Sequence, residues 1–232
     1  MIAISQLRLS LNKKSVLDRI DMMVSKGEIF GLTGLNGSGK SILLKVLATI
    51  LKPDSGIVQI SGYDIVKNVN QIRELIGYMP DDAEYDDRLS VEEHLEFFYS
   101  MYKSDRKGYS SSAEELMDVL ALHEIKNSLL SELSMGEKQK VSLARAAIHD
   151  PLVLLLDDPY ITVDRKNQER IETILKERSK RGRIIVVTSR SVKLLNNIAH
   201  RIGVLHEGSL KWIFPAGVES QESIDKKIEG LK

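Results

Sequence analysis

The sequence predicts an α/β fold with a mainly parallel central sheet. Three observations support this prediction. Short apolar runs alternate with helical patterns over the second half of the chain. A glycine-rich turn at 34–39 stands between a buried strand pattern and an amphipathic helix pattern. Each end of the chain carries a pair of strand patterns, 2–11 with 16–24 and 201–206 with 209–214, which predict hairpins.

The first half of the chain is expected to begin with the hairpin at 2–11 and 16–24, followed by a buried strand at 29–32. The next helix carries apolar residues on one face and is closed by Pro53 and Gly56. A further strand is expected at 57–65. Ser90 and Glu93 form a capping-box pattern, which predicts a helical segment that continues through 113–122 and ends near 131.

In the second half, helices at 137–149 and 167–181 alternate with strands at 152–156 and 183–188. The terminal hairpin and a charged tail at 219–232 complete the chain. We therefore expect a single domain over 1–232. An α/β core with an antiparallel β subdomain is formed by 1–83 and 136–214, a helical subdomain by 84–135, and a C-terminal tail by 215–232.

The composition excludes several functional classes. Thirty-three basic residues balance 33 acidic ones, so we expect no nucleic-acid partner. The absence of cysteine excludes disulfides, thiolate metal sites and cysteine nucleophiles, and is consistent with a reducing cytosol. The longest aliphatic run, 152–156, is far shorter than the roughly 18 residues of a membrane span, and the start resembles no signal peptide. Any membrane role is expected to come through a partner.

The glycine-rich turn fits the phosphate-loop pattern G-x-x-x-x-G-K-[ST] between a strand and a helix. Its backbone N–H groups would cradle phosphate oxygens, Lys40 would reach the β- and γ-phosphates, and Ser41 would bind Mg²⁺. The alternative is an ordinary turn. The predicted nucleotide-binding residues are Gly34, Leu35, Asn36, Gly37, Ser38, Gly39, Lys40 and Ser41.

Two carboxylates follow the apolar run at 152–156, at the sheet edge where phosphate loops also lie. Asp157 is the expected Mg²⁺ ligand, and Asp158 is placed to polarise an attacking water. The alternative is a solvated strand end before Pro159.

The stretch 133–139, Leu-Ser-Met-Gly-Glu-Lys-Gln, resembles the L-S-G-G-Q signature of ABC-type ATPases. The order and spacing of the motifs are similar to that family over nearly the whole chain. The sequence thus resembles an ABC transporter nucleotide-binding subunit. The patterns at 77–80 and 89–98 are most similar to ATPases of exporters with separate permeases.

This resemblance implies a subunit that dimerises head to tail on Mg-ATP, as a homodimer or a heterodimer, hydrolyses ATP and drives a separate membrane permease. It implies a cytoplasmic location, peripheral on the inner face of the cell membrane. Ser134, Gly136 and Glu137 of one subunit would then contact the nucleotide on the phosphate loop of the other. A simple helix N-cap is the alternative for these three residues.

Several positions depart from the family pattern. Leu11 takes the place of the aromatic residue that stacks on adenine, so weaker base selectivity is expected. Asp81 replaces a glutamine that contacts Mg²⁺ and the attacking water, and a carboxylate can still bind the metal. Met135 and Glu137 add bulk and negative charge to the signature. These changes are expected to weaken closure of the dimer.

Two further departures concern catalysis. Asp158 replaces the catalytic glutamate and retracts the carboxylate by about one bond, where a displacement of about 1 Å can cost on the order of a hundredfold in rate. Arg190 replaces the switch histidine and can contact the γ-phosphate. We expect Lys40, Asp158 and Arg190 to carry catalysis. A non-catalytic ATP-binding switch, or the degenerate half of a heterodimeric ATPase, is the alternative.

Two other stretches allow a functional and a structural interpretation. The segment 158–164 resembles the family stretch that crosses the dimer interface, with Pro159 and Asp164 retained; Asp164 could equally be a helix N-cap. The acidic segment 81–87 could be a docking face for the permease or a solvated loop. A GTPase is disfavoured, because the step Asn12-Lys13 is not followed by the aspartate that would bind guanine.

Overall fold

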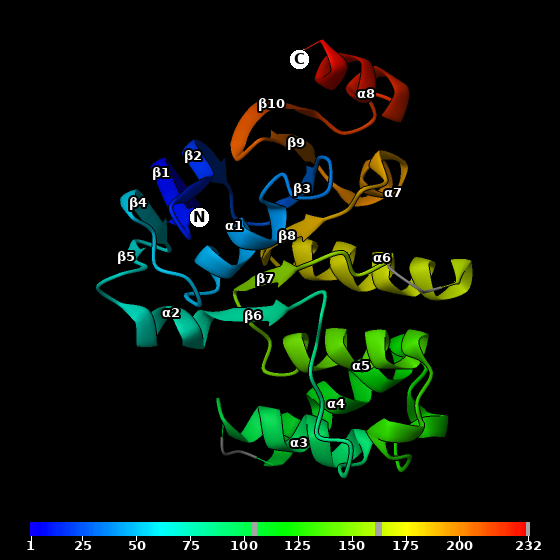
Figure 1. Cartoon of the computed structure of the whole chain (residues 1–232). Helices are drawn as coiled ribbons and strands as arrows, with labels where there is room; N and C mark the ends of the chain where they lie inside the picture. Colours follow the sequence, from blue (N-terminus) through cyan, green and yellow to red (C-terminus); the bar gives the residue numbers. More distant parts are fainter. Residues whose placement is uncertain (104–105, 161–163, 231–232) are drawn as a thin grey trace.

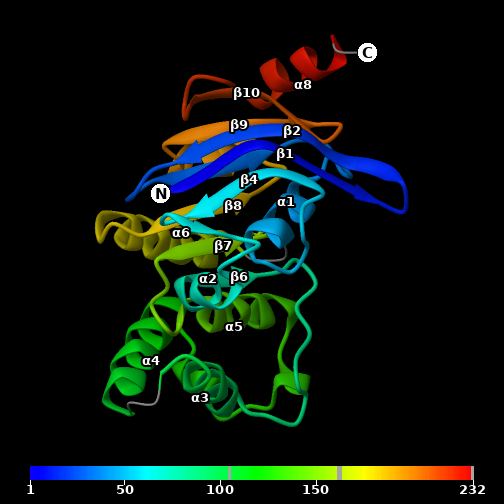
Figure 2. The same ribbon diagram turned by 90° about the vertical axis from the view of Figure 1, so that its left-hand side faces the viewer.

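The computed structural model describes residues 1–103, 106–160 and 164–230. Its centre is a six-stranded sheet in the order β10-β9-β3-β8-β7-β6 (Figures 1 and 2). All neighbours in it are parallel except the edge strand β10, which is antiparallel to β9. The prediction of a mainly parallel sheet is confirmed. The strands are β3 (Ile29–Thr33), β6 (Ile76–Met79), β7 (Val153–Leu156), β8 (Ile184–Thr188), β9 (Arg201–His206) and β10 (Ser209–Pro215).

A second, antiparallel sheet has the order β2-β1-β4-β5. It contains β1 (Ile2–Leu11), β2 (Lys14–Val24), β4 (Ser55–Ile60) and β5 (Tyr63–Asp64). The prediction of one continuous strand at 57–65 is wrong. Ser61 and Gly62 both have positive φ, 53° and 87°, and such a pair reverses the chain in a tight hairpin turn.

The central sheet separates two apolar cores. Alternate residues of β7 and β8, such as Leu155 and Val186, face the antiparallel sheet and helix α1 (Lys40–Leu47). The intervening residues, such as Leu156 and Val187, face α5 (Met135–Ala147), α6 (Arg165–Lys180) and α7 (Val192–Ile198). Strands buried on both faces explain the uninterrupted apolar runs in the sequence.

A mainly helical part lies beside the β6 edge of the sheet, at the bottom of Figure 1. It contains α3 (Val91–Ser100) and α4 (Arg106–Leu120), with short 3-10 turns at His123–Ile125 and Leu130–Glu132. The capping box that the sequence predicts is present, because Ser90 and Glu93 exchange side-chain to backbone hydrogen bonds. The sequence predicted that this helical segment continues from Ser90 through 113–122. It is instead divided, because α3 ends at Ser100 and α4 is a separate helix.

Three helices of the described chain were not predicted from the sequence: α2 (Val69–Leu75), α7 and α8 (Gln221–Glu229). The prediction of a simple charged tail at 219–232 needs correction. Ile224 and Ile228, four residues apart, lie on one face of α8 and are buried in the same core as α7.

No helix within the described ranges is long and apolar enough to cross a membrane.

Candidate functional site

The glycine-rich turn connects β3 to α1 and depends on its glycines. Gly34 has φ 147°, and a Cβ there would lie 2.1 Å from the carbonyl oxygen of Leu205. Gly39 has φ 108°, and its Cβ would lie 2.9 Å from the carbonyl oxygen of Val16. Side chains at these two positions would clash with the backbone of β9 and β2, so the loop is pressed against both sheets.

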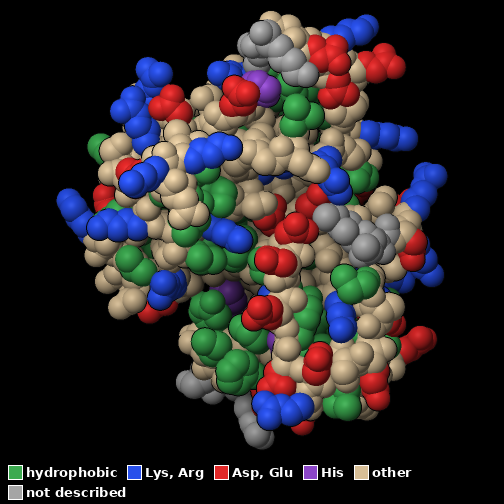
Figure 3. Space-filling model, viewed as in Figure 1, with side chains coloured by type: hydrophobic (Ala, Val, Ile, Leu, Met, Phe, Trp, Pro, Cys, Tyr) green, Lys and Arg blue, Asp and Glu red, His purple; other side chains and the backbone are tan. Residues whose placement is uncertain are grey.

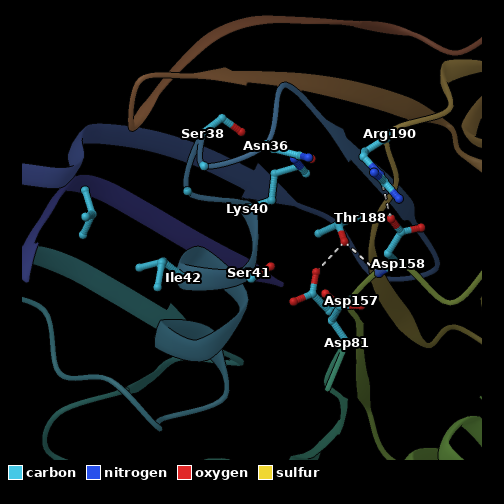
Figure 4. Close-up of a pocket in the computed structure, with 13 residues that line it drawn as sticks. Asn36, Ser38, Lys40, Ser41, Ile42, Asp81, Asp157, Asp158, Thr188 and Arg190 are labelled. Carbon is cyan, nitrogen blue, oxygen red and sulfur yellow. Dashed lines mark hydrogen bonds and ion pairs between the residues drawn. The ribbon is translucent and has the colours of Figure 1, made fainter. Parts of the chain in front are cut away.

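The loop borders a cavity of about 390 Å³ (Figure 4). The opposite wall comes from the carboxyl ends of the parallel strands β6, β7 and β8, which meet at the same sheet edge. The lining residues are Val16, Asn36, Gly37, Ser38, Gly39, Lys40, Ser41, Ile42, Asp81, Asp157, Asp158, Thr188 and Arg190.

Lys40 supplies a cation at the start of α1. Its Nζ donates to the carbonyl oxygens of Gly34 and Leu35 at 2.8 and 3.0 Å. Burial lowers the pKa of Lys40, and the nearby Asp157 and Asp158 oppose this shift. The ammonium group is thus held against the loop, within reach of any anion that the loop binds.

Asp157 directly follows β7 and is nearly fully buried, with 3% of its surface exposed. Its Oδ1 accepts a hydrogen bond from Thr188 Oγ1 at 2.7 Å. Its Oδ2 is buried without a hydrogen-bond partner in the part of the chain that the structure describes. A buried carboxylate oxygen of this kind needs a donor or a cation.

The residues around Asp157 fit a magnesium ion. Ser41 and Asp81 line the same cavity, so a hydroxyl and two carboxylates are brought together there (Figure 4). Mg²⁺ prefers oxygen ligands of this type together with phosphate oxygens. Burial raises the pKa of Asp81, as do the neighbouring carboxylates Asp157 and Asp82. A divalent cation would relieve this concentration of negative charge.

Asp158 lies next in the chain and has a strained backbone, with φ 45°. Its N–H donates to Thr188 Oγ1 at 2.9 Å, and its Oδ2 lies 3.6 Å from Arg190 Nε. Burial raises the pKa of Asp158, the Arg190 guanidinium lowers it, and Asp81 raises it further. The site therefore holds a carboxylate with a raised proton affinity beside the exposed guanidinium of Arg190.

The structure brings together most of the residues that the sequence predicts, but not Leu11, which is not among the lining residues. Leu11 ends β1, and Val16 of β2 lines the cavity instead. Val16 and Thr188 line the cavity but were not predicted from the sequence. The hairpin pattern gave no indication of Val16, whereas Thr188 ends a predicted strand two residues before Arg190.

Ser134, Gly136 and Glu137 lie apart from the cavity, at the start of α5. Ser134 and Glu137 form a complete capping box: Glu137 Oε2 accepts from Ser134 N at 2.9 Å and from Ser134 Oγ at 2.6 Å, and Glu137 N donates to Ser134 Oγ at 3.3 Å. Met135 is 66% exposed. Asp164 is the N-cap of α6 and accepts from Asn167 N at 2.9 Å. Residues 161–163 of the stretch 158–164, which the resemblance implies crosses a dimer interface, lie outside the described residues.

A family model described as ABC transporter matches residues 17–161, more than half of the chain. The chain belongs to the ABC transporter family. This confirms the prediction from the sequence that the chain is an ATP-binding subunit with the ATPase activity of that family.

One relative in this family is the bacitracin export ATP-binding protein BceA of Halalkalibacterium halodurans. It is 30% identical over 94% of this chain and 88% of its own length. The solved structure of an ATP-binding subunit of an ABC transporter superposes with a TM-score of 0.90 and is 23% identical. The match covers 100% of both chains. The ATP-binding cassette MJ0796, in a dimeric post-hydrolysis state with ADP and Pi, has a TM-score of 0.85 and is 22% identical, over 93% of this chain and 99% of its own. These structures support the ABC ATPase fold.

Proposed function

We propose that this chain is the energy-coupling subunit of an ABC exporter, which dimerises head to tail on Mg-ATP, hydrolyses ATP slowly and drives a separate membrane permease. The observation that carries the proposal is the convergence of Lys40, Asp157, Asp158 and Arg190 on the cavity beside the phosphate loop. Through the permease the subunit would be peripheral to the inner face of the cell membrane.

Ser41, Asp157 and Asp81 would hold Mg²⁺ in this proposal. The ion would neutralise the charge of the β- and γ-phosphates. Thr188 holds the Asp157 carboxylate by its Oδ1, which leaves the unpartnered Oδ2 as the ligand atom.

Lys40 is placed to exchange its loop carbonyl partners for phosphate oxygens when the loop fills. Asp158 would orient a water for in-line attack on the γ-phosphate and accept its proton, and Arg190 would leave Asp158 to contact the γ-phosphate. The short aspartate side chain sets the carboxylate back from that water. Slow hydrolysis follows from this geometry.

The geometry of the signature also supports slow turnover. The Ser134 hydroxyl donates a hydrogen bond to Glu137 Oε2 at the start of the same helix. While this bond is formed, the hydroxyl cannot donate to the γ-phosphate on a partner subunit. The hydrogen bonds from Ser134 lower the pKa of Glu137, which therefore carries a negative charge at neutral pH. A carboxylate at this position repels a partner's phosphate.

A groove at the junction of the core and helical parts supports a permease partner. It has a volume of about 740 Å³ and combines aromatic side chains, such as Phe98 and Tyr102, with Asp82 and Arg145. In Figure 3 apolar side chains gather at the lower left of the molecule, beside a column of acidic ones. An amphipathic helix is the partner that such a groove fits.

Steady-state phosphate release from Mg-ATP by the purified chain tests the proposal, with Lys40→Ala as the background control. We expect turnover above that control. Turnover at the control level, together with retained nucleotide binding in a separate assay, would instead identify a non-catalytic switch or a subunit that needs an intact partner.

A further inference from the structure

Arg190 lies between two cavities of the structure. On one side it lines the nucleotide cavity with Asp158, and Figure 4 shows it on the wall opposite Lys40. On the other side it lines a second cavity, of about 510 Å³, between the phosphate loop and helix α8. Gln221 and Asp225 of α8 line this second cavity too. The C-terminal helix is therefore close to the cation of the proposed catalytic site.

The position of the Arg190 guanidinium depends on the backbone that carries it. Its side chain is 59% exposed, and the ion pair with Asp158 spans 3.6 Å. A contact of this length contributes little to positioning a guanidinium that is itself so exposed. Arg190 belongs to the short connection between β8 and α7, and α7 begins two residues later at Val192.

Gln221 of α8 fixes the end of this connection. Its Oε1 accepts a hydrogen bond from Val192 N at 3.0 Å, which satisfies one of the backbone donors that a helix start leaves free. Its Nε2 donates to Asp225 Oδ1 at 3.1 Å, one turn further along α8. The amide therefore has a fixed orientation, with its oxygen directed at the start of α7.

The attachment of α8 to α7 is extensive enough to transmit this constraint. Asn196 of α7 donates to the carbonyl oxygen of Glu219 at 3.1 Å and accepts from Gly217 N at 2.8 Å. Ile224 and Ile228 are buried in the same core as Leu195. Helices α7 and α8 thus pack as one unit, from which Gln221 reaches the residue at the start of α7.

We propose that Gln221 is a positioning residue for ATP hydrolysis: its hydrogen bond to Val192 holds the connection 189–191 so that Arg190 faces the nucleotide cavity. This inference rests on the proposed catalytic role of Arg190. It assigns a function to the C-terminal helix in the reaction, although no atom of α8 lines the nucleotide cavity.

The test compares three variants in steady-state ATPase assays. Gln221→Met keeps the length of the side chain and removes the acceptor, and we expect kcat to fall about fivefold, the effect of one hydrogen bond of ordinary strength, with a smaller change in KM. The double variant Gln221→Glu/Asp225→Asn exchanges acid and amide, so both hydrogen bonds can form again and kcat should recover. Glu222→Gln, on the exposed side of the same helix turn, is the matched control.

A double-mutant cycle with Arg190→Ala separates positioning from a general loss of stability. If Gln221 acts through Arg190, Gln221→Met has no further effect on kcat in the Arg190→Ala background. An equal fall in both backgrounds, or an unchanged kcat in Gln221→Met alone, would overturn the inference. Full activity of Arg190→Ala alone would instead refute the proposed role of Arg190. Melting temperatures of all variants show whether each one is folded.

Discussion

Thr188 donates its hydroxyl hydrogen to Asp157 Oδ1 at 2.7 Å, across the neighbouring strands β8 and β7. The same hydroxyl oxygen accepts the N–H of Asp158 at 2.9 Å. One buried side chain therefore orients the expected metal ligand and the backbone of the expected base. The parallel register of β7 and β8 makes this possible, because both strands end at the same edge of the sheet.

Thr188→Val is expected to weaken magnesium binding. Valine has the same shape but cannot orient Asp157, and loss of such an outer contact costs roughly 10- to 100-fold in metal affinity or activity. The Mg²⁺ concentration for half-maximal ATPase activity should rise accordingly. Thr173→Val, at an exposed site on α6, is the matched control. Equal Mg²⁺ dependence in both variants would contradict the role given to Thr188.

Asp158→Glu is expected to raise turnover. The longer side chain would carry the carboxylate about one bond further toward the attacking water, and a change of about 1 Å can alter the rate on the order of a hundredfold. Asp158→Asn, which keeps the size but removes the base, should reduce turnover to the Lys40→Ala background. Single-turnover measurements separate this chemical step from product release. If Asp158→Asn retains full turnover, Asp158 is not the base.

Glu137→Gln is expected to strengthen dimerisation on ATP. The substitution removes the negative charge from the start of α5 and weakens the bond that engages the Ser134 hydroxyl, which now lies 2.6 Å from Glu137 Oε2. Sedimentation in Mg-ATP, with an Asp158→Asn background to prevent hydrolysis, measures the dimer fraction. Glu132→Gln, in the preceding 3-10 turn, controls for the loss of one charge. A dimer fraction that does not change would show that Glu137 does not oppose closure.

The sequence predicted the residues of the site better than the elements that support them. A phosphate loop and a strand-terminal aspartate have fixed chemical tasks, so their residue types identify them without tertiary information. Helix α8 has no such mark. Most of its residues are polar or charged. Its two isoleucines, Ile224 and Ile228, are buried only because they pack into the core that also contains α7, and the sequence alone does not show this contact. Val16 likewise reaches the cavity only because β2 packs against the loop at Gly39.

The pH dependence of hydrolysis should reflect the environment of Asp158. Burial raises its pKa and Arg190 lowers it, and the base works only when ionised. The rate kcat/KM is thus expected to fall as the pH drops through a pKa above the ordinary aspartate value. Arg190→Ala removes the opposing cation, so its acidic limb should move to higher pH. Arg165→Ala, at an exposed site on α6, should leave the limb unchanged, and a limb that is equal in all three proteins would contradict this assignment.

Two buried histidines are expected to make the fold sensitive to acid. Burial lowers the pKa of both His94 and His149 to about 4. Between pH 6.5 and 4 the unfolded chain therefore binds protons that the folded chain does not, and the free energy of unfolding decreases as the pH falls.

His149 offers the direct test. Its ring stacks on Tyr102 with centroids 3.7 Å apart, and its Nε2 lies 3.1 Å from the carbonyl oxygen of Ile76, to which it donates as a neutral imidazole. At pH 8 His149→Gln should cost stability through the lost stacking on Tyr102 and the altered hydrogen bond to Ile76, with no contribution from protonation. Between pH 6.5 and 4 its unfolding free energy should fall less steeply than that of the original chain, by up to about 3 kcal/mol over the interval. Urea titrations at several pH values measure both curves, and parallel curves would show that His149 is protonated equally in the folded and unfolded states.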